Sequence, residues 1–239
     1  MVQLMNQFDF ETRCLPFMKQ TIHTSWLLRS VLKWALFLFG LFLLAVGSSM
    51  MITAQLGVST WDVLHLGLQN KTPFSVGTII LLVGLLLVFV KYLIDRITPQ
   101  VGTLVNAIFV GVFMNLVLGS GLLPSFSSLW QNTLWLIAGI FIIGMGAGLY
   151  VAVGYGAGPR DGLTLTLAER FGTSIRMMRT FMEITACGIG WLLGGPVFFG
   201  TILSIFLIGP FLQFWLGHFR RMIAAIDAGT IPRKQQKIS

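Results

Sequence analysis

Two stretches of the sequence, LGVSTWDVLHLGL at 56–68 and YGAGPRDGLTLTL at 155–167, resemble each other. Gly57 and Asp62 in the first stretch correspond to a glycine and an aspartate 99 positions later in the second, and three leucines recur at the same spacing. Each stretch has a glycine as its second residue, which permits a tight turn, and continues into a short apolar segment. This pair predicts an internal duplication of the chain.

The correspondence extends beyond the two stretches. At the same offset the sequence aligns Gly40 with Gly139, Gly47 with Gly146, and Ser75 with Ser174. After a slip of one residue, GTLVNAIFVGVFMNLVLG at 102–119 aligns with GTILSIFLIGPFLQFWLG at 200–217, which pairs Asn115 with Gln213. Three matching segments in the same order are a strong signal of two repeats.

Composition places the chain in a membrane. Hydrophobic residues make up 55% of the sequence and charged residues only 10%, and the mean hydropathy is +0.84. These values lie far outside the range of soluble globular proteins. Apolar runs close to the length that crosses about 30 Å of hydrocarbon occur six times, at 31–54, 75–94, 101–120, 133–154, 177–195 and 199–217. The sequence therefore predicts an all-α polytopic membrane protein with about six transmembrane helices.

Basic residues set the expected orientation, because loops rich in Lys and Arg stay in the cytoplasm. Basic and non-basic loops alternate along the chain, beginning with the basic tail at 1–30 and ending with the basic tail at 220–239. Both tails are expected in the cytoplasm, with a first three-span repeat at 31–121 and a second at 132–219. An odd number of spans in each repeat inverts the second repeat relative to the first.

The formal net charge of +8 comes mostly from the basic residues in the loops and tails that are expected in the cytoplasm. Nucleic-acid binding would need a basic surface on a folded soluble domain, so it is not expected. Anionic lipid headgroups at the cytoplasmic face are the expected partners of these loops, besides the bilayer itself.

The two opening stretches are the first candidate site. Ser59 or Thr60 and the GPRD segment at 158–161 each predict the start of a short helix, with Asp62 and Asp161 in its first turn. In one interpretation the turns only cap helices, or the segments lie as interfacial helices on the lipid surface. In the other, they are re-entrant and meet near the midplane. The candidate binding residues are Trp61, Asp62, Gly158, Arg160 and Asp161. Trp61 also fits a membrane-interface anchor.

Polar residues within the spans are the second set of candidates, because each needs a partner away from water. Glu183 follows Arg179 by four residues, so the two are expected to pair on one helix face, with a proton or cation relay as the alternative. Asn115 and Gln213 fit hydrogen bonding between helices or a place in the site. Arg160, Arg170, Arg176 and Arg179 surround one cytoplasmic loop, as expected from orientation bias or from a phosphate-bearing ligand.

Catalytic patterns are missing from the sequence. His23, His65 and His218 lie in unrelated segments, and no His/Cys, Ser/His/Asp or HExxH set can be assembled. We therefore expect a protein that is not an enzyme and that holds no cofactor or metal.

The segments LGVSTWDVLHLGL, GLYVAVGYGAGPRDGLTLTLAERFGTSIRMMRT and GWLLGG resemble the YczE/YyaS/YitT family of bacterial integral membrane proteins over about residues 30 to 218. That resemblance implies a multi-span protein of the bacterial inner membrane and no settled activity. The chain departs from the family pattern at 58–60, where a Gly-Pro step before Trp61 is expected.

The architecture favours a small transporter that moves a small molecule, an ion or a lipid-linked group by alternating access. The alternative is a non-transporting membrane protein that stabilises or positions an enzyme or an export complex. Nothing in the sequence specifies the substrate, the coupling ion or the oligomeric state.

Overall fold

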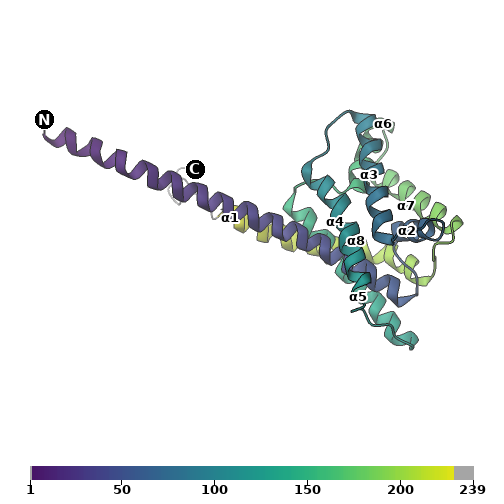
Figure 1. Cartoon of the computed structure of the whole chain (residues 1–239). Helices are drawn as coiled ribbons and strands as arrows, with labels where there is room; N and C mark the ends of the chain where they lie inside the picture. Colours follow the sequence, from purple (N-terminus) through teal and green to yellow (C-terminus); the bar gives the residue numbers. More distant parts are fainter. Residues whose placement is uncertain (1, 229–239) are drawn as a thin grey trace.

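The computed structural model describes residues 2–228, with side chains from Trp26 to Asp227. The described residues form helices and no strands, as predicted (Figure 1). The helices are α1 (Val2–Ala54), α2 (Thr60–Gln69), α3 (Val76–Asp95), α4 (Val101–Gly119), α5 (Leu129–Val153), α6 (Pro159–Phe171), α7 (Ile175–Leu192) and α8 (Phe199–Ala228).

Five of these helices are long and apolar enough to cross a membrane: Trp26–Ala54 of α1, α3, α4, α5, and Phe199–Asp227 of α8. The remaining predicted span, 177–195, coincides with α7. This helix has only 18 residues and carries Arg176, Arg179 and Glu183, which is why its composition falls short of the other five. The structure thus supports a polytopic membrane protein, with α7 as the exceptional helix.

The predicted tails continue into helices where they are described. The segment predicted as an N-terminal tail belongs to α1, which extends well beyond the helix bundle (Figure 1). Residues 220–228 continue α8, and 229–239 lie outside the described residues. Lys33 of α1 and Asp227 of α8 form an ion pair at 2.6 Å, so the carboxyl end of α8 lies beside the middle of α1.

The boundaries of the helices recur along the chain. Helix α2 begins at Thr60 and α6 at Pro159, 99 positions later, and α3 and α7 begin at Val76 and Ile175 with the same spacing. Local signals explain these starts. Ser75 and Ser174 cap α3 and α7 with their hydroxyl groups, and Ser59 caps α2 in the same way. Proline opens α6, where its fixed φ suits the first helical turn.

Helices α1 and α5 form the centre of the bundle and pack through glycines. A β-carbon on Gly47 would lie 2.6 Å from the Gly139 carbonyl oxygen, and one on Gly40 would lie 3.0 Å from that of Gly146. Glycines at these positions let the two backbones approach closely, as is common between membrane helices. These contacts pair residue 40 with 146 and residue 47 with 139, so the two helices cross in antiparallel directions.

Each of the two turns rests on the beginning of a distant helix. Gly57, with φ +108°, lies against Thr201 at the start of α8, where a β-carbon would be 2.8 Å from the backbone nitrogen. Gly156, with φ +155°, lies against Thr103 at the start of α4, where the same distance would be 2.9 Å. Both positions combine a left-handed φ with no room for a side chain, which explains the glycine at the second position of each stretch.

Candidate functional site

A cavity of about 850 Å³ lies in the middle of the described bundle. The amino-terminal ends of α2 and α6 both reach it, together with residues of α1, α3, α4, α5, α7 and α8. Seven of the nine predicted site residues line it: Trp61, Asp62, Gly158, Arg160, Asp161, Arg179 and Glu183. The structure therefore brings the two turns together at one cavity. Each turn also precedes the start of a short helix, α2 or α6.

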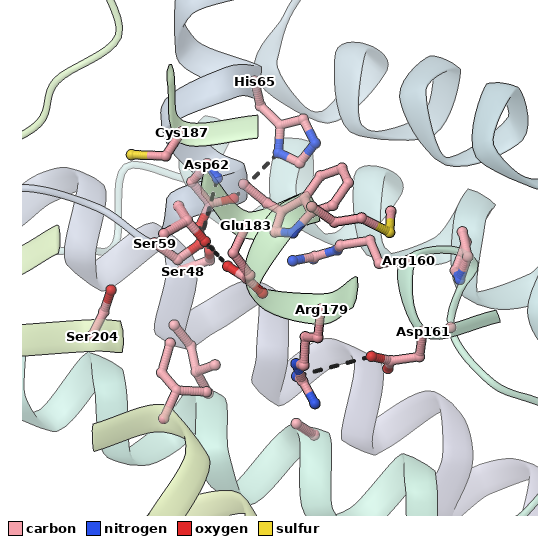
Figure 2. Close-up of a pocket in the computed structure, with 18 of the residues that line it drawn as sticks. Ser48, Ser59, Asp62, His65, Arg160, Asp161, Arg179, Glu183, Cys187 and Ser204 are labelled. Carbon is pink, nitrogen blue, oxygen red and sulfur yellow. Dashed lines mark hydrogen bonds and ion pairs between the residues drawn. The ribbon is translucent and has the colours of Figure 1, made fainter. Parts of the chain in front are cut away.

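The two turns contact each other through residues at corresponding positions. The guanidinium carbon of Arg160 lies 5.2 Å from the centre of the Trp61 ring. This distance is within the range of a cation–π interaction, which is stronger where water is excluded. Figure 2 shows Arg160 reaching from α6 toward the cluster formed by Asp62, Ser59 and Glu183. Trp61 thus faces the cavity instead of serving as an anchor on the lipid surface.

Asp62 is held by three side chains (Figure 2). Its carboxylate accepts hydrogen bonds from the hydroxyls of Ser48 and Ser59, the second at 2.7 Å, and lies 3.3 Å from Nδ1 of His65. The side chain is almost fully buried. Burial alone raises the pKa of Asp62, but the hydrogen bond and charge of His65, the Ser48 hydroxyl and the charge of Arg160 together hold that pKa below its usual value. The site therefore contains a carboxylate that is fixed by hydrogen bonds.

Asp161 occupies the corresponding position in the second turn and is held much more loosely. Its nearest cation is Arg179, at 3.9 Å, and the Tyr150 hydroxyl lies 3.5 Å away. Where Asp62 has Ser48, Ser59 and His65, the second turn has an alanine, a glycine and a threonine at 147, 158 and 164. These residues supply no equivalent set of donors, and 41% of the Asp161 side chain is exposed. The two aspartates thus share a position but differ in how firmly they are fixed.

Glu183 joins α7 to the first turn. Its carboxylate accepts a hydrogen bond from the Thr60 hydroxyl, which lies at the start of α2. The predicted pairing of Glu183 with Arg179 is wrong, because Arg179 turns toward Asp161 instead (Figure 2). A spacing of four residues makes such a pair possible on an isolated helix, but here each residue has a partner on another helix.

The two remaining candidates, Asn115 and Gln213, do not line the cavity. The Asn115 side chain accepts a hydrogen bond at 3.0 Å from the backbone N–H of Gly77, so it links α4 to α3. Gln213 is exposed on α8. Their correspondence in the repeats therefore does not place them together in the site.

Ser48, His65 and Tyr150 are among the cavity residues that were not predicted as site residues from the sequence. His65 had a detectable signal, because its spacing of three residues from Asp62 places both on one helix face. Ser48 and Tyr150 had only the weaker signal of polar groups within apolar runs. Among the residues with described side chains, no three His, Cys, Asp or Glu side chains gather as a metal-binding group. The arrangement offers charged and hydroxyl groups that can bind and orient a polar ligand.

These features define a class: a helical multi-span membrane protein with a polar cavity at the meeting of two related turns. The chain belongs to the family described as a family of unknown function (DUF6198), which it matches over residues 31–217.

Among curated proteins, it is 37% identical over 187 residues to the uncharacterized membrane protein YczE of Bacillus subtilis, covering 78% of this chain and 86% of that protein. An uncharacterized protein of Haemophilus influenzae is 32% identical over 188 residues, 79% of this chain and 85% of that protein. The uncharacterized protein YyaS of B. subtilis is 26% identical over 186 residues, 77% of this chain and 92% of that protein. No solved structure matches the chain. The predicted resemblance to the YczE and YyaS proteins is confirmed, and so is the membrane class.

Proposed function

We propose that this protein is a small transporter of the bacterial inner membrane that binds its substrate in the central cavity and moves it by alternating access. The observation that carries the proposal is that both turns, 99 residues apart in sequence, reach one cavity and supply charged groups to it. Transporters built from repeats commonly place their binding site where the repeats meet, at the ends of discontinuous helices. The binding groups would be Trp61, Asp62, Arg160, Asp161, Arg179 and Glu183.

The proposal includes six spans, counting α7, in two inverted three-span repeats. Its support is the exchange of contacts between the halves: Gly57 rests on Thr201 as Gly156 rests on Thr103. The antiparallel glycine contacts of α1 with α5 follow the same exchange. Such reciprocal contacts are expected around a pseudo-two-fold axis in the membrane plane.

The proposed orientation has both termini in the cytoplasm. It rests on the alternation of basic loops, and it places the arginines near α6 and α7 where they can meet anionic lipid headgroups. The same account treats the protein as a carrier without catalytic activity or resident cofactor, and without a role in nucleic-acid binding.

Cys187 offers a direct test, because it lines the cavity and the chain has only one other cysteine, Cys14. In a Cys14→Ser variant, a membrane-impermeant thiol reagent should modify Cys187 from either side of oriented vesicles, since alternating access opens the cavity to each side in turn. The double variant with Cys187→Ser is the background control.

Modification from one side alone would contradict alternating access. If native-membrane cross-linking also recovered one stoichiometric companion protein, the accessory role would replace the transporter. Recovery of a companion protein alone would not reject the transporter, because modification of Cys187 from both sides is the result that supports alternating access.

A further inference from the structure

The cavity has an opening between α7 and α8 that has no counterpart in the other half. Helices α3 and α4 pack closely: a β-carbon on Gly77 would lie 2.1 Å from the Gly111 carbonyl oxygen. Within the described part of the chain, α7 and α8 make no comparable contact. The sequence differs at this contact, since the position of Gly77 is taken in α7 by Arg176. Gly209, the counterpart of Gly111, has no atom within 4 Å of where a β-carbon would be.

Apolar side chains form the walls of this opening. The cavity is lined by Ile184, Gly188 and Trp191 on α7 and by Ile205, Ile208 and Leu212 on α8. Trp191 is 64% exposed and Ile205 57% exposed in the isolated chain. In a bilayer, an opening between two helices with such walls faces acyl chains, so an apolar chain can occupy it without losing contacts to hydrocarbon.

The cavity wall carries three carboxylates and three arginines, and two of these arginines form no ion pair among the described residues. Each carboxylate has a partner: Asp62 has its three donors, Asp161 has Arg179, and Glu183 has Thr60. Arg160 contacts the face of an aromatic ring, and Arg176 forms no ion pair among the described residues. Arginine binds phosphate and carboxylate groups through paired hydrogen bonds, which these two side chains have available.

The amino terminus of α6 adds to this preference for an anion. Its capping residue, Gly158, is buried and has no side chain to accept from the first N–H groups of the helix, whereas Ser59 does so for α2. The helix dipole favours a negative group at this end of the cavity, where Asp161 already lies in the first turn.

We propose that the cavity binds an anionic amphiphile, with a phosphate or carboxylate head at Arg160 and Arg176 and a hydrocarbon chain in the opening between α7 and α8. This inference rests on the proposed function, because it names the substrate class of the same cavity. The anionic head has two possible sources, a lipid and a free soluble anion, and the experiment below separates them.

The experiment measures binding of dodecyl phosphate to the full-length protein in a neutral maltoside detergent by native mass spectrometry. We expect saturable binding with one dodecyl phosphate per chain, displaced by excess unlabelled probe and not by inorganic phosphate at the same concentration. Arg160→Gln should weaken binding about tenfold or more, because a charge-assisted pair is lost, and Arg160→Lys should recover part of it.

A second variant tests the opening. Gly209→Leu places a side chain in open space beside the cavity, so it should weaken binding of dodecyl phosphate about tenfold while leaving the unfolding temperature unchanged. Gly217→Leu is the matched control, since Gly217 lies on the same helix, also has free space around it and does not line the cavity. If Gly209→Leu lowers the unfolding temperature, Ile205→Trp replaces it.

Displacement of dodecyl phosphate by inorganic phosphate at the same concentration would show that the cavity recognises the anionic head alone. That result would overturn the proposal of an amphiphilic ligand. Equal binding by wild type, Arg160→Gln and Gly209→Leu would overturn the site altogether. These outcomes are independent of the transport test: binding without two-sided reactivity of Cys187 would reject the transporter alone, and two-sided reactivity without binding would reject the amphiphile alone.

Discussion

The first turn and the second turn occupy equivalent positions in the chain, yet one is fixed and the other is loose. Asp62 is buried and held by Ser48, Ser59 and His65, whereas Asp161 is partly exposed with a distant arginine. The same contrast separates the tightly packed α3 and α4 from α7 and α8. Two similar stretches of sequence thus differ in their surroundings: one is fixed by hydrogen bonds and close helix packing, and the other leaves space beside the cavity.

The largest expected effect comes from filling the tight helix contact. Gly111→Leu should destabilise the protein by more than about 3 kcal/mol, because a β-carbon there would lie 2.2 Å from the Gly77 carbonyl oxygen. Gly209→Leu, at the corresponding position of α8, should change stability by less than about 0.5 kcal/mol, as for other substitutions without a steric cause. Thermal unfolding in detergent measures both, and equal losses would remove the contrast between the halves.

Substitution of the two aspartates should also lower stability more in the first turn than in the second. Asp62→Asn should cost about 2–3 kcal/mol, because the buried donors around it lose a charged acceptor. Asp161→Asn should cost less than about 1 kcal/mol, since its ion pair is partly exposed. Chemical denaturation of the two variants in the same detergent gives this comparison; a larger loss for Asp161→Asn would reverse it.

The two turn glycines mark where the halves agree. Gly57→Ala and Gly156→Ala should each destabilise the protein by about 1–2 kcal/mol, since both positions have positive φ and a close backbone neighbour. Their unfolding temperatures should fall by similar amounts. A loss confined to one variant would mean that only one turn rests firmly on the distant helix.

The smallest effect is expected from Arg179. Arg179→Gln should change stability by less than about 0.5 kcal/mol, because its 3.9 Å pair with Asp161 is more than half exposed on the arginine side. Thermal unfolding at low and at high salt should show little dependence on the variant. A loss above about 2 kcal/mol would show that the second turn is held as firmly as the first.

Much of the fold could be predicted because its signals are local or periodic. Apolar runs gave the positions of five helices that can cross a membrane, and Ser59 marked the start of α2. Repetition of glycine and aspartate identified the turns that reach the cavity. The signal was strong there because glycine is required by positive φ at Gly57 and Gly156.

The rest depended on contacts between helices, which sequence spacing does not specify. Arg179 forms its ion pair with Asp161 on α6 and not with Glu183 on its own helix. Asn115 accepts a hydrogen bond from α3 and does not line the cavity. Helices α7 and α8 lack the close contact of α3 with α4, and the sequence has an arginine at 176 at the position that corresponds to Gly77. The meaning of the arginine at 176 can be recognised in the sequence only once the close contact between Gly77 and Gly111 is known.

The central claim is that the two turns enter one cavity from opposite sides of the membrane. Lys71→Cys and Arg170→Cys, introduced singly into a cysteine-free background, test it most directly, because these exposed positions lie 99 residues apart at the carboxyl ends of α2 and α6. The arginines at 160, 176 and 179 remain to preserve the orientation. A membrane-impermeant maleimide added outside should label Lys71→Cys and should reach Arg170→Cys only from the cytoplasmic side; labelling of both from the same side would contradict the account.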